Sequence, residues 1–148
     1  MIEVRTMKWK FAKRICDEHH YLGSPVGHKF SLGIYDINSR RPLGVMIFGQ
    51  PVARLLDDGE TLEMTRMCLM EQRPNLATQS LSKALKWIRQ NRSEKKLISY
   101  SDGDHKGTIY AAAGWKPIKL SGGGKWKSGR GRRANIRWER PVTKMRIS

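Results

Sequence analysis

The order of its periodic segments is the feature that most constrains how this chain can fold. Apolar residues follow a strand-like pattern in seven short runs and recur at helical spacing in three segments between them. The resulting order, β-α-β-β-β-α-β-α-β-β, predicts a single α/β domain over residues 1–148, with a mixed, mostly antiparallel sheet flanked by helices. We expect strands at 2–6, 29–35, 42–48, 62–69, 96–101, 116–120 and 134–139, and helices at 11–19, 77–90 and 105–113.

The run at 62–69 carries apolar side chains at both odd and even positions, which is typical of a central strand with both faces covered. If this strand is regular, Glu63 and Arg66 lie on opposite faces because they are three positions apart. The two side chains could then not line the same site. Arg66 is a candidate for contacting a phosphate or orienting a substrate, and a surface ion pair is the alternative.

The charge of the chain indicates the kind of partner it binds. It has 29 Lys and Arg residues against 13 Asp and Glu residues, a formal net charge of +16. Such an excess favours nucleic acid over an anionic membrane, because each neutralised phosphate releases condensed counterions. No apolar run approaches the roughly 18 residues of a membrane helix, and residues 1–20 lack a signal-peptide core. We therefore expect a cytoplasmic protein without a membrane partner, in which Cys16 and Cys68 are reduced core thiols.

A basic, glycine-rich loop at 121–133 is the strongest candidate for contact with nucleic acid. Its glycines allow the loop to follow a groove, its arginines can meet phosphates, and its tryptophan offers a stacking face between two lysines. Such a loop could also help to extract a base from the duplex. A merely solvated loop is the alternative. The residues expected to contact nucleic acid are Lys125, Trp126, Lys127, Arg130, Arg132 and Arg133.

The segment 99–115 resembles the last strand and helix of the GNAT acyltransferase fold. A strand ends at Ser101-Asp102, and a helix follows that Gly114 can end in a left-handed turn. In that superfamily a helical tyrosine precedes a Gly-aromatic pair by four residues and points at the sulfur of the acyl-CoA thioester. Tyr110 matches this position, and its phenol could protonate the departing thiolate. The alternative is a tyrosine whose ring simply packs on the sheet.

Five ordered blocks narrow the resemblance to the phage Mom protein family of DNA-modification enzymes. They are His20-Tyr21-Leu22-Gly23, Phe48-Gly49-Gln50-Pro51, Leu62-Glu63-Met64-Thr65-Arg66, Ser99-Tyr100-Ser101-Asp102 and Gly107-Thr108-Ile109-Tyr110. The resemblance implies an enzyme that uses acetyl-CoA to place an acetamido-type group on the N6 amine of adenine in double-stranded phage DNA. The modified DNA is then protected from host restriction enzymes. The family also implies iron as a further cofactor.

Four side chains are the candidates for catalysis under this resemblance: His20, Tyr21, Asp102 and Tyr110. They could converge at the strand ends of a GNAT-like sheet. Imidazole, carboxylate and phenolate groups suit iron, so the four could be its ligands. They could instead run acid–base catalysis without metal, with Asp102 or His20 taking a proton from the attacking amine. His20 facing only solvent is the third possibility.

Cofactor binding is expected at the start of the helix at 77–90. The GNAT phosphate loop reads Arg or Gln, two residues, Gly, one residue, then Gly or Ala, and residues 72–80 occupy its place without glycines. The helix N-terminal amides could still hold the pyrophosphate of acetyl-CoA, helped by Arg73, Thr78 and Ser80. An ordinary capped helix is the alternative.

Two rival functions fit the same sequence. A conventional GNAT N-acetyltransferase would act on a protein, a polyamine or a small amine and would need no DNA. A DNA-binding protein that kept the fold but lost catalysis would bind DNA in a salt-sensitive way and leave its mass unchanged.

Overall fold

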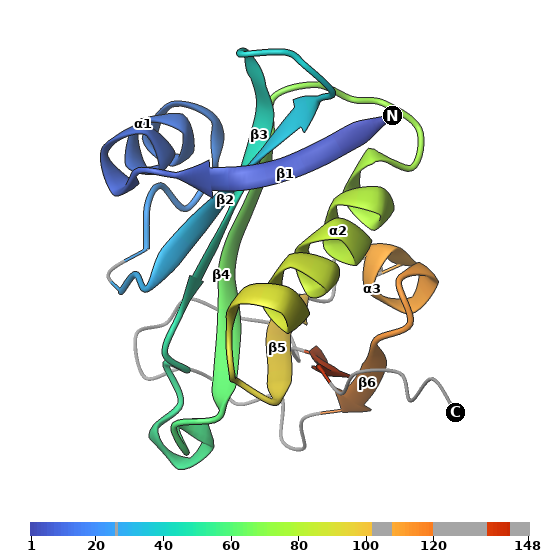
Figure 1. Cartoon of the computed structure of the whole chain (residues 1–148). Coiled ribbons are helices and arrows are strands. Elements are labelled where there is room, and N and C mark those ends of the chain that lie inside the picture. The colour runs from blue at the N-terminus through green and yellow to red at the C-terminus, as the bar shows by residue number, and fades with distance from the viewer. Residues whose placement is uncertain (26, 102–107, 120–135, 143–148) are drawn as a thin grey trace.

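The computed structural model describes residues 1–25, 27–101, 108–119 and 136–142 (Figure 1). Its strands form one seven-stranded sheet in the order β1-β2-β3-β4-β5-β7-β6. Neighbouring strands are antiparallel except for the parallel pair β4 and β5. The elements are β1 (Ile2–Met7), α1 (Trp9–His19), β2 (Phe30–Asp36), β3 (Pro42–Gly49), η1 (Arg54–Leu56), β4 (Thr61–Leu69), α2 (Leu76–Asn91), β5 (Lys96–Ser101), α3 (Thr108–Ala112), β6 (Lys116–Lys119) and β7 (Ile136–Pro141).

The predicted fold class is confirmed: the chain is an α/β protein whose mostly antiparallel sheet is flanked by helices. The predicted element order is also the observed order, with the short 3-10 helix η1 as an addition that the periodicity did not indicate. Gly114 adopts a φ of 86°, so the predicted left-handed turn after α3 is present. The expected positions 105–107, 120, 134 and 135 lie outside the described residues.

Helices cover both faces of the sheet and divide its apolar residues into two clusters. Helices α2 and α3 lie on one face and α1 lies on the other (Figure 1). The larger cluster joins α2 and α3 to residues such as Leu32, Phe48 and Leu97. The smaller cluster lies under α1 and contains both cysteines, which are buried free thiols.

A β-bulge at Thr65 changes which face each later residue of β4 occupies. Opposite β3, Phe48 pairs with Met64 while the adjacent Ile47 pairs with Arg66, so Thr65 is an extra residue. Before the bulge Met64 packs in the α2 cluster, and after it Cys68 packs in the α1 cluster. The expectation that Glu63 and Arg66 lie on opposite faces was therefore wrong, because it assumed a regular strand. The side chains of Glu63 and Arg66 both point to the α1 face.

The parallel pairing of β4 and β5 stops early, and this opens the sheet near its centre. It comprises three residue pairs, the last of which is Glu63 with Ile98. Beyond that point β4 continues beside β3, whereas Ser99–Ser101 of β5 continue beside β7. We call the divergence after Glu63 and Ile98 the β4–β5 split. The bulge at Thr65 lies directly after the split, and bulges are over-represented next to active sites.

Candidate active site

A short chain of hydrogen bonds spans the β4–β5 split on the α2 face. The Ser99 hydroxyl lies 3.0 Å from the Met64 carbonyl oxygen, to which it donates, and 3.0 Å from the Tyr110 hydroxyl. Because a serine hydroxyl has one hydrogen, Tyr110 must be the donor in the second bond. The phenol of Tyr110 is thus aimed at the split from α3.

The ring of Tyr110 is also packed as a core residue. It stacks on Trp138 at a centroid distance of 5.6 Å and meets the edge of Trp115 at 5.3 Å. Burial raises the pKa of the phenol above its usual value, and the hydrogen bond with Ser99 only partly opposes this rise. Tyr110 is therefore a packed ring with a protonated hydroxyl at the split, and its catalytic role stays a prediction.

The Ser99–Tyr110 hydrogen bond should contribute to the free energy of unfolding. Ser99→Ala is expected to cost about 1–3 kcal/mol, because it leaves the buried Tyr110 hydroxyl without a partner, while Tyr110→Phe is expected to cost only about 1 kcal/mol. In a Tyr110→Phe background the serine substitution should cost less, giving a coupling of about 1 kcal/mol in a double-mutant cycle. Urea unfolding of the four proteins measures this coupling. Strictly additive losses would show that the two hydroxyls do not interact.

Glu63 lies at the same split but on the α1 face. Its residue exposure is 7%, and its Oε1 accepts a hydrogen bond of 3.0 Å from the Val52 N–H. Burial raises the pKa of the carboxyl, while the Val52 bond and the Arg66 charge partly oppose the rise. Tyr100 of β5 is close enough for Glu63 to raise the pKa of its phenol further, beyond the effect of burial. A buried carboxylate with a raised pKa beside an opening in the sheet is a candidate proton acceptor.

The turn after α1 carries His20 and Tyr21, whose rings stack at a centroid distance of 4.8 Å. The Leu22 N–H donates to His20 Nδ1 over 3.1 Å, so this nitrogen carries no proton and Nε2 holds the hydrogen. Burial and then the nearby Arg66 charge lower the pKa of the imidazole, which keeps it neutral. In this conformation His20 offers no free lone pair to a proton or a metal. It is a hydrogen-bond donor through Nε2.

Tyr21 is 75% exposed. Of the four predicted catalytic residues, the structure brings His20 and Tyr21 together as a stacked pair after α1, and it places Tyr110 on α3. Asp102 lies outside the described residues, and its role remains a prediction.

The described part of the predicted iron-ligand set does not fit a metal. His20 Nδ1 is occupied by the Leu22 N–H, and the Tyr110 hydroxyl donates to Ser99. Within residues 1–25, 27–101, 108–119 and 136–142, no group of three or more His, Cys, Asp or Glu side chains is placed to hold a metal ion. We therefore derive no chemical step through iron.

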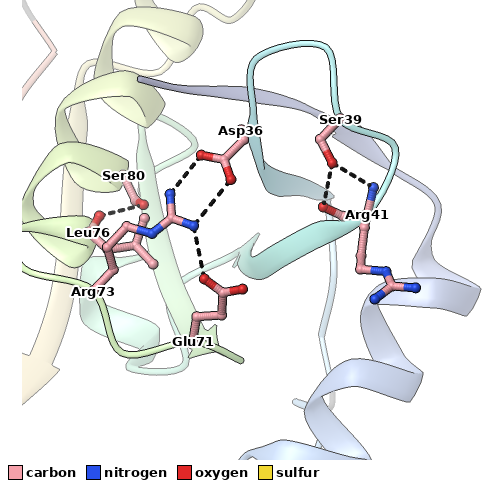
Figure 2. Close-up of polar contacts among 7 residues, drawn as sticks. All are labelled: Asp36, Ser39, Arg41, Glu71, Arg73, Leu76 and Ser80. Atoms are coloured by element: carbon pink, nitrogen blue, oxygen red, sulfur yellow. Dashed lines mark hydrogen bonds and ion pairs between the residues drawn. The ribbon is translucent and has the colours of Figure 1, made fainter.

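A cleft of about 720 Å³ opens on the α2 face, between the start of α2 and α3. Two of the three predicted cofactor contacts, Arg73 and Thr78, line it. Ser80 does not: its side chain is fully buried, and its hydroxyl donates to the Leu76 carbonyl over 2.7 Å within the helix (Figure 2). The lining residues are Leu69, Glu71, Gln72, Arg73, Pro74, Asn75, Leu76, Ala77, Thr78, Thr108, Ile109 and Ala112.

The loop that precedes α2 resembles a phosphate loop more closely than its sequence indicates. Asn75 adopts a φ of 63°, the left-handed conformation that glycine usually supplies. Gln72, Asn75 and Ala77 therefore stand where the GNAT signature has its first residue, its first glycine and its final Gly or Ala. The tolerance of asparagine for this conformation is the signal that sequence reasoning missed.

Arg73 is held by two carboxylates at the mouth of the cleft. It donates to Asp36 over 2.6 and 3.1 Å and to Glu71 over 2.9 Å (Figure 2). These bonds fix the loop to the end of β2. To bind a phosphate, Arg73 would have to exchange a carboxylate for it. The α2 amides are thus more available to a ligand anion than this guanidinium is.

Solved structures define the class of fold. The ribosomal-protein-S18-alanine N-acetyltransferase from Escherichia coli matches at a TM-score of 0.67 and 10% identity, covering 100% of this chain and 98% of that one. A spermidine/spermine N-acetyltransferase from Vibrio cholerae matches at 0.68 and 10%, covering 95% and 92%. A Bacillus subtilis acetyltransferase in complex with CoA matches at 0.65 and 9%, covering 94% and 97%. The chain has the fold of the GNAT acetyltransferases.

Residues 1–132 match the Mom protein family, and the chain belongs to that family. A search of curated proteins finds no significant match. None of the described helices is both long enough and apolar enough to span a membrane. The six loop residues predicted to contact nucleic acid, within 121–133, lie outside the described part of the chain.

Proposed function

We propose that this protein is an acyl-CoA-dependent DNA-modification enzyme that acts on the N6 amine of adenine in double-stranded DNA. The observation that carries this proposal is that candidate catalytic groups lie on both faces of the sheet at one opening. The cleft is lined by α2 and α3 on the α2 face, and Tyr110 of α3 directs its hydroxyl to the β4–β5 split on that face. Glu63 lies at the split on the α1 face. A thioester and an amine can thus approach one opening from opposite faces, as direct transfer requires.

Acetyl-CoA is the donor that best suits the cleft. Its phosphates would lie at the N-terminus of α2, where the helix dipole and the first-turn N–H groups after Leu76 favour anions; the Leu76 N–H itself donates to the Arg73 carbonyl. Asn75 shapes that turn, and Thr78 adds a hydroxyl. One structural neighbour is a complex with CoA, which supports the same class of ligand here.

The transfer step would use one group from each face of the sheet at the split. The amine nitrogen attacks the thioester carbonyl, a C–N bond forms, the C–S bond breaks, and CoA leaves as a thiolate. Glu63 takes the proton that the amine loses. A buried phenol has a higher pKa than a thiol, near 8.5 for cysteine, so Tyr110 would keep its proton. It would stabilise the thiolate by turning its O–H from Ser99 to the sulfur. This shifts its role from the general acid expected from the sequence.

DNA is the acceptor that the charge favours. A chain with a net charge of +16 attracts a polyanion and repels a polyamine, which argues against the substrate of the Vibrio cholerae neighbour. Basic side chains are exposed along α1 and just before it, and α1 covers the face of the sheet that carries Glu63. In sequence, residues 121–133 contribute further cations and Trp126. The residues on and before α1 are Lys8, Lys10, Lys13 and Arg14. Adenine modified at N6 would no longer be read by restriction enzymes.

Transfer of label from acetyl-CoA tests this proposal against its rivals. The purified protein is incubated with labelled acetyl-CoA and, separately, with duplex DNA, spermidine or a basic peptide. We expect label in DNA only, at a rate that falls steeply with added salt. Label in spermidine or peptide alone would show a conventional N-acetyltransferase. DNA binding with no label in any acceptor would show a binding protein without catalysis.

A further inference from the structure

We propose that Arg66 is a positioning residue that fastens the His20–Gly23 turn to the bulged strand β4 and so fixes the α1 side of the split. The anchor itself consists of contacts within this chain and does not depend on the proposed function. Its effect on catalysis rests on the proposed function.

The bulge at Thr65 is what allows Arg66 to reach this turn. After the bulge Arg66 faces α1, and its Nε donates to the Gly23 carbonyl over 2.9 Å. Its Nη1 donates over 2.7 Å to the carbonyl of Thr65, the bulged residue itself. One planar guanidinium therefore joins the bulge to the turn. Lysine cannot reproduce two donors in this fixed geometry.

Three other hydrogen bonds in and beside this turn are local. The Leu22 N–H donates to His20 Nδ1 and the Gly23 N–H to the His20 carbonyl, while the Ser24 N–H donates to Asp17. These bonds shape the turn, but they do not attach it to the sheet. The bond from Arg66 to Gly23 does, across 43 positions of sequence.

The anchored turn carries His20 and Tyr21. It lies next to the split, because Arg66 holds Gly23 and faces the same side of β4 as Glu63, the last residue paired with β5. If the anchor is lost, His20 and Tyr21 should move relative to Glu63 and to the adenine that accepts the acetyl group. The acetyl-CoA cleft lies on the opposite face and should be unaffected.

Hydrogen exchange and kinetics of the full-length protein test the anchor. In both Arg66→Lys and Arg66→Ala, the amides of Leu22, Gly23 and Ser24 should exchange about tenfold faster. The kcat for DNA should fall about tenfold or more, while the KM for acetyl-CoA stays within about twofold of wild type. Arg40→Lys, at an exposed arginine of the β2–β3 turn, is the matched control and should leave both readouts unchanged.

Arg66→Lys keeps the charge and the stem, so it guards against a variant that fails only because it unfolds. Unchanged exchange at residues 22–24 in both variants would overturn the proposal. So would full activity in Arg66→Lys with a reduced salt dependence in Arg66→Ala, since that pattern marks a phosphate contact. Faster exchange in a protein that modifies no DNA would uphold the anchor and refute the proposed function instead.

Discussion

Glu63→Gln is expected to lower kcat for DNA modification by about two to four orders of magnitude. The amide cannot take the proton of the attacking amine, whereas its oxygen can still accept the Val52 N–H that Glu63 accepts now. The protein should remain folded. Because burial raises the pKa of the carboxyl, its ionised form is less stable in the folded protein, and removing the charge should slightly increase stability near neutral pH.

The pH profile separates this role from a structural one. The carboxylate is the active form, so kcat/KM of the wild type should rise with pH through the raised pKa of Glu63, above the ordinary 4.5. Glu63→Gln should lose that rise. Glu60→Gln, at an exposed residue just before β4, is the control and should behave as wild type. An unchanged kcat in Glu63→Gln would exclude Glu63 as the proton acceptor.

Ala112→Glu is expected to weaken acetyl-CoA binding by about tenfold or more. Ala112 lines the cleft on α3, so the new carboxylate would repel the CoA phosphates and fill part of the space. Isothermal titration calorimetry of acetyl-CoA without DNA measures this loss directly. The substitution is on an exposed position and should not disturb the core.

Ala111→Glu is the matched control for the cleft. Ala111 is also an exposed alanine of α3, but it does not line the cleft. The two variants have the same charge and nearly the same helix propensity, so a difference in acetyl-CoA affinity reports only the position of the new carboxylate. Equal affinities in both variants would place the cofactor elsewhere.

The periodicity of the chain was sufficient to predict the fold because each strand and helix buries a distinct apolar face. The bulge at Thr65 could not be predicted in this way. Residues on both faces of β4 are apolar, so a shift of one position leaves no trace in the pattern. That shift puts Glu63 and Arg66 on one face, and it is the reason that sequence reasoning did not recognise Glu63 as part of the site.

The location of one candidate residue was predictable from the family resemblance. The spacing of Tyr110 to Gly114 indicated its place on the last helix, and the structure directs its hydroxyl to the split. Its catalytic role stays a prediction. Roles that depend on hydrogen-bond partners were not predictable: His20 is a donor because Leu22 occupies its Nδ1, and Ser80 bonds its own helix. Asp102 and the basic loop at 121–133 lie outside the described residues and remain predictions.

Mass spectrometry of nucleosides tests DNA modification most directly. DNA is isolated from cells that express the wild-type protein or Glu63→Gln, and its deoxyadenosine is analysed after complete digestion. We predict a modified deoxyadenosine in the wild-type sample, with a mass that distinguishes an acetyl from an acetamido group, and little or none in the Glu63→Gln sample. Unmodified nucleosides from cells that contain abundant, folded wild-type protein, repeated with phage DNA, would contradict the proposed function.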